Sequence, residues 1–414
     1  MDDQVAQRKA GIILTACVLF NLTIGVLYAW SVITPLLTAE TAYGGYGWTV
    51  SQAGFPFSVA IIMIAVMVLV GGRIQDKVGP RKVLTAGGIL VGLGLVLSGV
   101  IGNNPIGVTI SFGIIMASGT GMSYASLTPP ALKWFHSSKK GFVSGLIVGG
   151  FGLSAVFYAP ITSALLERFG IETTFIILGG AIFAICMGLA RIIKNPPNGY
   201  VPAAPEQAVQ KVAGAPAIDY SWREMVVTRH FQLMCVIYFF TASVGLMVIG
   251  NASTIARSQA SITDAGILAV IVSLLAFTNT FGRVAGGFIS DKIGRINTLF
   301  VILVLQAVNM AAFVLYSNLF LLVIGVIFAG LCFGALLSVM PALCADAYGL
   351  KNFGLNYGIL FLFWGLAGFV APIVANILYD TTGSFNIAYI ICAVITGLMI
   401  FANFALKRAL GTVK

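Results

Sequence analysis

Long apolar stretches separated by short polar segments run from end to end of this chain, and they limit what it can fold into. A helix needs about 20 apolar residues to cross the hydrocarbon core of a bilayer, and twelve stretches approach or exceed that length. Hydrophobic residues make up 59% of the 414 residues and charged residues only 9%, whereas soluble domains are about one-quarter charged. The sequence therefore predicts an all-α membrane protein with little chain left over for a soluble domain.

The apolar stretches form two sets of six. The first set is predicted at residues 11–36, 50–72, 83–102, 106–131, 141–166 and 171–193, and the second at 229–256, 265–289, 296–316, 319–343, 352–379 and 384–406. The segment between the sets holds five prolines and scattered charges, a composition typical of a linker. We expect an N-terminal six-helix half at 1–194, a cytoplasmic linker at 195–228 and a C-terminal six-helix half at 229–414.

The basic residues assign the two sides of the membrane. With alternating helix directions, 20 of the 23 Lys and Arg residues fall on the side of both termini and the linker, Arg168 and Arg257 fall on the other side, and Arg283 remains inside a span. By the positive-inside rule, both termini and the linker are cytoplasmic. The net charge of +10 thus marks sidedness, and we expect the lipid bilayer rather than nucleic acid as the partner.

One polar segment occurs twice. Gly72-x-x-x-Asp76-Lys77-x-Gly79-Pro80-Arg81 follows the second apolar stretch, and Gly287-x-x-x-Asp291-Lys292-x-Gly294-Arg295 follows the eighth, at an offset of 215 residues. Glycine lets two helices approach, and an aspartate near a helix end can pair with Arg or Lys in a latch that breaks when two halves rock. The alternative, an ordinary basic turn, is less favoured for two copies. The predicted gating residues are Asp76, Lys77, Asp291, Lys292 and Arg295.

Arg283 is the one charged residue that the predicted spans place well inside the membrane, because all thirteen acidic residues fall in loops or at helix ends. It lies eight residues before Asp291, or about 12 Å along a helix. A buried arginine is costly unless it is paired, so an anionic substrate whose carboxylate accepts a bidentate contact is the expected partner. Asn279, one turn earlier, can orient the guanidinium. The alternative is that Arg283 extends to the cytoplasmic interface and binds nothing.

The doubled Gly-x-x-x-Asp-Lys-x-Gly segment resembles the major facilitator superfamily over the whole chain. Within it, residues 279–283 running into 290–295, residues 25–30 and residues 133–135 resemble the monocarboxylate and oxalate/formate transporters, including bacterial homologues that carry lactate. The resemblance implies the major facilitator fold in a bacterial inner membrane, with Arg283 binding the substrate carboxylate. It also makes Tyr28 and Tyr124 substrate-binding candidates; either residue alone is otherwise an interface or packing aromatic.

The chain departs from these relatives at informative positions. The oxalate/formate antiporter has a lysine where this chain has Trp364 and a glutamine where it has Leu27. One arginine and an apolar lining suit a single carboxylate with a small apolar tail, because a second carboxylate would enter unpaired at a cost of several kcal/mol. A monoanion such as lactate or pyruvate meets this description, whereas oxalate meets it poorly. Aromatic residues that can line the site, or simply pack or face lipid, are Phe151, Phe333 and Phe361.

Coupling to protons is a separate hypothesis. The animal relatives carry an aspartate where this chain has Asn279, and their helix-one lysine is replaced by Ser31 or its neighbours. Importing an anion against a membrane potential costs about 2.3 kcal/mol per 100 mV, which co-transport of one proton removes. We therefore predict proton symport by alternating access, with an anion-for-anion antiporter as the alternative. The sequence shows no catalytic constellation for an intramembrane enzyme or flippase, no metal-ligand spacing and no sensor domain. We therefore expect a transporter without cofactor. We also expect it to be monomeric.

Overall fold

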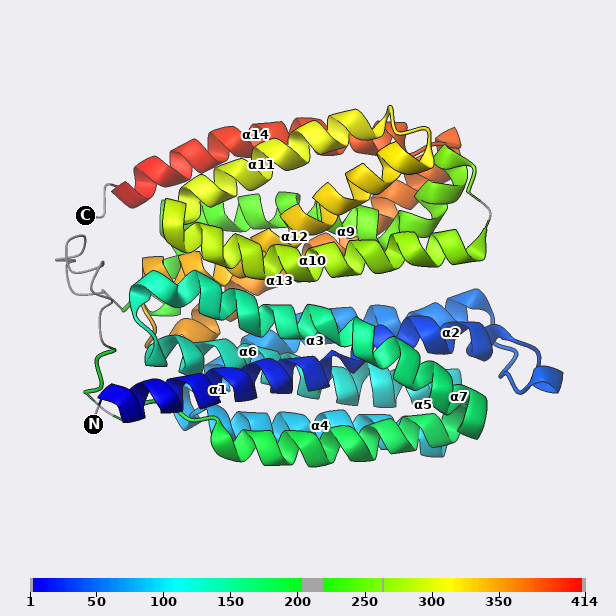
Figure 1. Cartoon of the computed structure of the whole chain (residues 1–414), viewed down its shortest axis with the longest axis horizontal. Coiled ribbons are helices and arrows are strands. Elements are labelled where there is room, and N and C mark those ends of the chain that lie inside the picture. The colour runs from blue at the N-terminus through cyan, green and yellow to red at the C-terminus, as the bar shows by residue number, and fades with distance from the viewer. Residues whose placement is uncertain (1–2, 198, 203–218, 263, 412–414) are drawn as a thin grey trace. The chain divides into compact units, whose positions relative to one another are not determined.

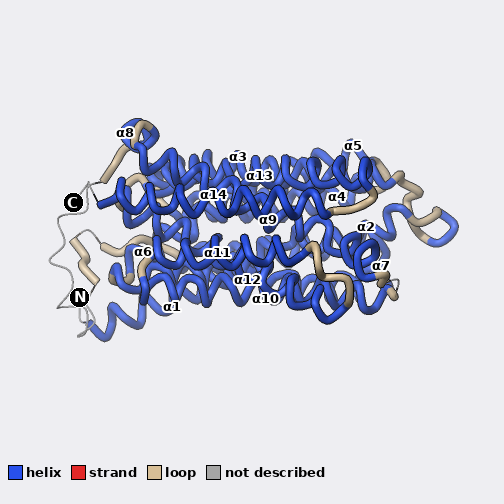
Figure 2. Tube along the Cα trace, turned by 90° about the horizontal axis from the view of Figure 1, so that it is seen from above, coloured by secondary structure: helices blue, strands red, loops and turns tan. Residues whose placement is uncertain are grey.

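The computed structural model describes residues 3–197, 199–202, 219–262 and 264–411, which form helices and loops but no strand (Figures 1 and 2). A few side chains inside helices, including those of Tyr28 and Ser31, are not described. Eleven described helices are long and apolar enough to cross a membrane. The longest, α7 (Lys140–Ile192), has 53 residues and non-helical backbone at Gly170. At 1.5 Å per residue it is about 80 Å long, so it supplies two spans across a core of about 30 Å, and the described chain has the predicted twelve.

The first span is α1 (Asp3–Ile24), which continues through a 3₁₀ turn η1 (Gly25–Ala29) into α2 (Trp30–Thr38). The fourth span combines α5 (Pro105–Val108), a π-helical segment η3 (Thr109–Met116) and α6 (Ala117–Trp134). The other spans are α3 (Val50–Val78), α4 (Pro80–Ile101), α9 (Arg229–Ala260), α10 (Ala265–Ile293), α11 (Arg295–Phe313), α12 (Leu319–Tyr348), α13 (Phe353–Thr382) and α14 (Asn386–Gly411). Short connecting helices are η2 (Thr41–Tyr43), η4 (Ser137–Lys139) and α8 (Trp222–Val226).

The predicted loops after the second and eighth spans are partly helical. Helices α3 and α10 each run past the predicted end of the span and include Asp76 and Asp291. They end at Gly79 and Gly294, whose φ angles are 84° and 90°. Glycine adopts this left-handed region without the steric penalty of a Cβ atom. The aspartates therefore sit on the last turn of a helix, in agreement with their predicted position near a helix end.

Contacts within the chain define two compact units. Unit 1 contains Met1–Phe135, Gly150–Ala203 and Phe353–Phe361, and unit 2 contains His136–Gly149, Ala204–Asn352 and Leu362–Lys414. Each unit therefore holds most of one predicted half together with the first turns of a helix from the other half, α13 in unit 1 and α7 in unit 2. The division into halves at residues 1–194 and 229–414 stays a prediction.

Small residues let the helices of unit 1 pack closely. A Cβ atom added at Gly71 would collide with Met122, and one at Gly121 would collide with Ile64, so the backbones of α3 and α6 approach each other at both places. Gly119 brings α6 equally close to α4. Because lipid is as apolar as leucine, such close packing rather than the hydrophobic effect holds membrane helices together.

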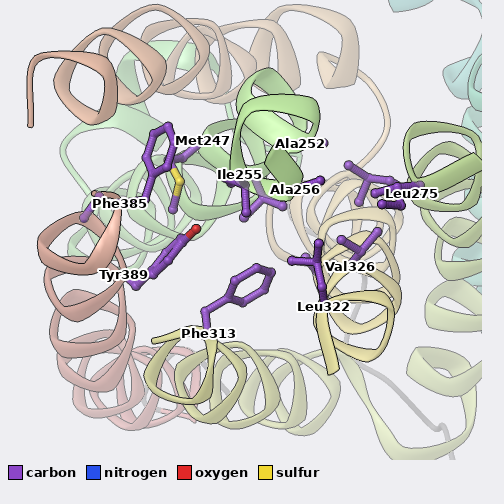
Figure 3. Close-up of a cluster of buried hydrophobic side chains, with 14 of the residues drawn as sticks. Met247, Ala252, Ile255, Ala256, Leu275, Phe313, Leu322, Val326, Phe385 and Tyr389 are labelled. Carbon is purple, nitrogen blue, oxygen red and sulfur yellow. The ribbon is translucent and has the colours of Figure 1, made fainter. Parts of the chain in front are cut away.

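Unit 2 repeats this arrangement with α10 and α12. Gly282 and Gly286 on α10 have no room for a Cβ atom because α12 lies against them, and Gly330 and Gly334 on α12 face α10 in the same way. Apart from this seam, a cluster of buried apolar side chains joins α9, α10, α12 and α14 (Figure 3). In unit 2, α11 and α14 run side by side (Figure 1). The seam between α10 and α12 is what positions Arg283.

Candidate functional site

Arg283 is buried in unit 2, with only 3% of the residue exposed. Its Nε donates a hydrogen bond to Asn279 Oδ1 at 3.2 Å, the contact that their four-residue spacing on α10 predicts. A guanidinium nitrogen also donates to the backbone carbonyl of Val148 on α7 at 2.6 Å. The side chain is therefore held inside the protein, and the alternative in which it extends to the cytoplasmic interface is wrong for this structure.

The guanidinium has more donors than partners. It carries five N–H groups, and the bonds to Asn279 and Val148 use two of them, so three have no partner among the residues that the structure describes. Among the residues that the structure describes, no Asp or Glu forms an ion pair with Arg283. A positive charge in a buried place, fixed by two hydrogen bonds and still able to donate more, can bind a carboxylate in bidentate fashion.

Close backbone packing fixes Arg283 from two sides. Gly145 on α7 lies against the Arg283 carbonyl oxygen, so that an added Cβ atom would collide with it. Gly334 on α12 lies in the same way against the Asn279 carbonyl oxygen. The arginine thus stands where three helices of unit 2 meet, and the glycines at 141 and 145 serve the helix packing that their spacing predicts.

The predicted residues Phe333 and Trp364 also belong to unit 2. Phe333 is buried on α12, next in sequence to Gly334, and its ring lies against Gly245 on α9. Trp364 is half-buried on α13, in the part of this helix assigned to unit 2. Phe333 therefore packs between α12 and α9, beside the seam between α10 and α12. The alternative interpretation of Phe333 as a packing residue predicts the same position.

Unit 1 brings three predicted aromatic residues together. The Tyr124 ring of α6 lies 5.5 Å from the Phe151 ring of α7 and 5.4 Å from the Phe361 ring of α13, measured between centroids. All three are buried. Sequence reasoning missed Tyr357, whose ring lies 5.7 Å from that of Phe361, although its one-turn spacing from Phe361 on α13 was a usable signal. The spacings are within the range of favourable aromatic pairs.

Leu27 and Tyr28 lie in η1, where the first span changes from α-helix to 3₁₀ helix. Leu27 is buried, and the side chain of Tyr28 lies outside the described part of the chain. Gly25 at the start of η1 packs against Ser154 on α7, and the Ser154 hydroxyl donates to the Gly25 carbonyl at 3.1 Å. A break within a spanning helix exposes backbone groups that a transporter can use at its site.

We call the contact of Asp76 with the start of α13 the first latch. Its Oδ1 accepts from the N–H of Gly354 at 3.1 Å, and its Oδ2 accepts from the N–H of Leu355 at 2.9 Å. Asp76 forms no ion pair with Arg or Lys among the described residues, which corrects that part of the prediction. The positive end of the α13 helix dipole and the charge of Lys133 both favour the ionised carboxylate.

We call the matching contact of Asp291 with the start of α7 the second latch. Its two oxygens accept from the N–H groups of Gly141 at 2.9 Å and Phe142 at 2.7 Å. Asp291 also pairs with Arg295, as predicted. Arg295 further pairs with Asp346 at 3.0 Å, and Asp346 pairs with Lys140 at 3.1 Å.

Two of the predicted gating residues do not take part in the latches, and two others were missed. Lys77 is exposed, and Lys292 is exposed with its ammonium 4.3 Å from the centre of the Phe288 ring. Lys140 and Asp346 join the second latch although they are 206 residues apart, so no local spacing could have paired them. The available signal was that one is basic and the other acidic, at helix ends on the side predicted to be cytoplasmic.

Comparison with known proteins agrees with this architecture. A profile described as the Major Facilitator Superfamily matches residues 19–317 and 246–411. The chain is 29% identical to the uncharacterized MFS-type transporter YhjX of Escherichia coli over 87% of this chain and 86% of that protein. It is 26% identical to the oxalate:formate antiporter of Oxalobacter formigenes, over 94% and 88%.

More distant proteins share the architecture as well. Monocarboxylate transporter 12 of Rattus norvegicus is 24% identical over 87% of this chain and 77% of its own length. The crystal structure of the Escherichia coli fucose:proton symporter superposes with a TM-score of 0.72, covering 96% of this chain and 98% of that one, at 15% identity. At that identity the superposition establishes the fold alone.

Proposed function

The chain belongs to the major facilitator superfamily of membrane transporters, and from this premise we propose that it carries small monocarboxylates of the lactate and pyruvate class. The observation that carries the proposal is the buried guanidinium of Arg283, which keeps three N–H donors and has no carboxylate partner among the described residues. The printed names of two relatives, the oxalate:formate antiporter and monocarboxylate transporter 12, support a small organic anion as the cargo.

One cation favours one carboxylate. An arginine inside a membrane protein costs about 2.5–3.5 kcal/mol on insertion scales, and a bound anion relieves that cost by neutralising the charge. The Asn279 and Val148 bonds hold the guanidinium in place before the substrate arrives, so little ordering entropy is lost on binding. We propose that the aromatic residues Tyr124, Phe151 and Phe361 contribute the apolar part of substrate recognition.

Transport proceeds by alternating access in this proposal. The first and second latches hold the starts of α13 and α7 to the ends of α3 and α10. Breaking and re-forming these contacts on the cytoplasmic side would open and close the path. Substrate binding at Arg283 lowers the energy of the closed intermediate because it removes an unpaired charge from a low-dielectric place.

Proton symport is the proposed coupling. Lactate uptake alone would move a negative charge against the membrane potential at about 2.3 kcal/mol per 100 mV, and one accompanying proton cancels this charge. A second candidate is anion-for-anion exchange, which is favoured by the name of the Oxalobacter formigenes relative. Exchange would keep Arg283 neutralised in both directions and requires no proton site.

Uptake of labelled L-lactate into proteoliposomes tests the proposal. Charged hydrogen bonds contribute about 1.5–3 kcal/mol each, so Arg283→Gln should lower uptake at subsaturating lactate about ten- to hundred-fold. The matched control is Arg168→Gln, which removes an exposed arginine that lies over the Phe169 ring. Unimpaired uptake by Arg283→Gln contradicts the carboxylate role of Arg283.

The same vesicles distinguish the two couplings. In symport, an inward proton gradient, with the outside of the vesicle more acidic than the inside, raises the initial rate of lactate uptake several-fold. In exchange, internal unlabelled lactate accelerates uptake of labelled lactate and an imposed pH step does not. Competition by acetate, propionate, pyruvate and oxalate then ranks the cargo, and the single arginine predicts that oxalate competes least.

A further inference from the structure

A surface groove runs along the first half of α1 in unit 1. It has a volume of about 410 Å³ and lies between α1 and the last turn of α7. No residue of the proposed substrate site or of either latch belongs to it. Its lining residues are Gln7, Arg8, Gly11, Ile12, Thr15, Ala16, Leu19, Leu189 and Ile192.

The shape of the groove matches an acyl chain. Arg8, Ile12, Thr15 and Leu19 follow one another at spacings of three and four residues and therefore form one stripe along α1. Ile12 and Leu19 are 49% and 46% exposed. The stripe from Arg8 to Leu19 spans eleven residues, or about 16 Å, which is roughly one leaflet of a hydrocarbon core about 30 Å thick.

Among the described side chains, positive charge gathers at one end of the groove. Arg8 lines the groove, and Lys9 beside it is exposed. On α7, the exposed Arg191 stands between the lining residues Leu189 and Ile192. These residues lie on the side that the positive-inside rule assigns to the cytoplasm. The groove therefore combines a cationic mouth with an apolar body.

A second apolar groove provides the contrast. It lies in unit 2 between the first turns of α10 and α12, has a volume of about 370 Å³ and is lined by Ile267, Val270, Leu274 and other apolar residues. The charged residue among its lining residues is Asp264. The two grooves have similar sizes and opposite charges, so an anionic headgroup suits only the first.

We propose that the groove along α1 is a binding site for an anionic phospholipid of the cytoplasmic leaflet. One acyl chain lies against Ile12, Thr15 and Leu19, and the phosphate accepts hydrogen bonds from Arg8 with Lys9 and Arg191 nearby. Attraction between a basic residue near the membrane surface and anionic lipid contributes about 1 kcal/mol, which is added to the burial of the chain. The site does not depend on which substrate the protein carries.

Native mass spectrometry of the purified full-length protein tests the site. The protein is equilibrated with mixed micelles of phosphatidylglycerol or phosphatidylcholine, and retained lipid is counted. Wild type should retain phosphatidylglycerol in preference to phosphatidylcholine. Arg8→Gln should lower phosphatidylglycerol retention about five-fold, the factor that corresponds to one basic residue, and its matched control is Arg408→Gln on α14.

A second variant fills the groove instead of removing its charge. A Cβ atom at Gly11 meets nothing within 4 Å, so Gly11→Leu fits the fold and occupies the place of the acyl chain. It should lower retention of phosphatidylglycerol, whereas Gly180→Leu, at another glycine with open space around it, should not. Equal retention of the two lipids by wild type, or wild-type retention by both Arg8→Gln and Gly11→Leu, would overturn the proposal.

Discussion

Asp76 and Asp291 occupy matching positions in the two copies of one sequence segment, and their surroundings differ. Both carboxylates accept two backbone N–H bonds at the start of a helix, α13 for Asp76 and α7 for Asp291. Among the residues that the structure describes, only Asp291 adds ion pairs, through Arg295 to Asp346 and on to Lys140. The first latch is thus a helix cap, and the second is a helix cap within a charge network.

The two copies also differ by one residue directly after the glycine that ends the helix. Arg295 directly follows Gly294 and stands four residues after Asp291, and the two side chains meet. In the first copy Pro80 follows Gly79, so Arg81 stands five residues after Asp76 and is exposed. Asp291 lies on the last turn of α10 and Arg295 is the first residue of α11, so their ion pair forms across the turn at Gly294 and not along one helix face. The comparison teaches that a repeated segment can keep its backbone contacts while changing its charge partners.

The largest effect is expected for Asp291→Ala. This change removes the cap of α7 and leaves Arg295, whose side chain is 9% exposed, without its main partner. Breaking a buried ion pair costs about 3–5 kcal/mol, so the free energy of unfolding in detergent should fall by about that amount. Denaturant titration measures it, with Lys292→Ala as a control that should change little. A loss no greater than that of Asp76→Ala would contradict the comparison.

A smaller effect is expected for Asp76→Ala. The carboxylate caps α13 without an ion pair among the described residues, and loss of such a cap costs about 1–2 kcal/mol. Denaturant titration in detergent measures this decrease in the free energy of unfolding. Asp76→Asn keeps one oxygen acceptor and should lose less than the alanine variant. If both substitutions at Asp76 cost as much as Asp291→Ala, the two latches are equivalent and the charge network adds nothing.

The smallest effect is expected for Asp346→Asn. The Asp346 side chain is 35% exposed where it meets Lys140 and Arg295, and exposed pairs contribute about 0.2–1 kcal/mol. The Asp346→Asn variant should therefore lose at most about 1 kcal/mol of unfolding free energy. The difference should be smaller still in 1 M salt, because the Debye length there is about 3 Å. A loss above about 2 kcal/mol, unchanged by salt, would place Asp346 at the centre of the second latch.

Most of the fold could be predicted from the sequence because spanning helices need long apolar runs. The predicted span at 229–256 and the observed α9 begin at the same residue, for example. The repeated aspartates indicated where the latches lie, and the four-residue spacing of Asn279 and Arg283 predicted their hydrogen bond. These features depend on local spacing, which a sequence displays directly.

Other features depend on contacts that local spacing does not reveal. The Val148 carbonyl bound by Arg283 is a backbone group, so its residue type carries no signal. Asp346 and Lys140 meet across 206 residues. The 3₁₀ turn η1 at Gly25–Ala29 contains no proline, so the sequence does not predict a change of helix type there. The continuation of α3 to Asp76 was missed because charged residues mark the end of an apolar run before the helix itself ends.

Carboxylate binding by Arg283 is the central claim, and ligand-induced thermal stabilisation tests it directly. A ligand that binds only the folded protein stabilises it by about 2.7 kcal/mol at one hundred times its Kd. L-Lactate should raise the unfolding temperature of wild type, while lactamide, which replaces the carboxylate with a neutral amide, should not. Arg283→Gln should respond to neither ligand. Equal stabilisation of wild type by lactate and lactamide, or of Arg283→Gln and wild type by lactate, would contradict the claim.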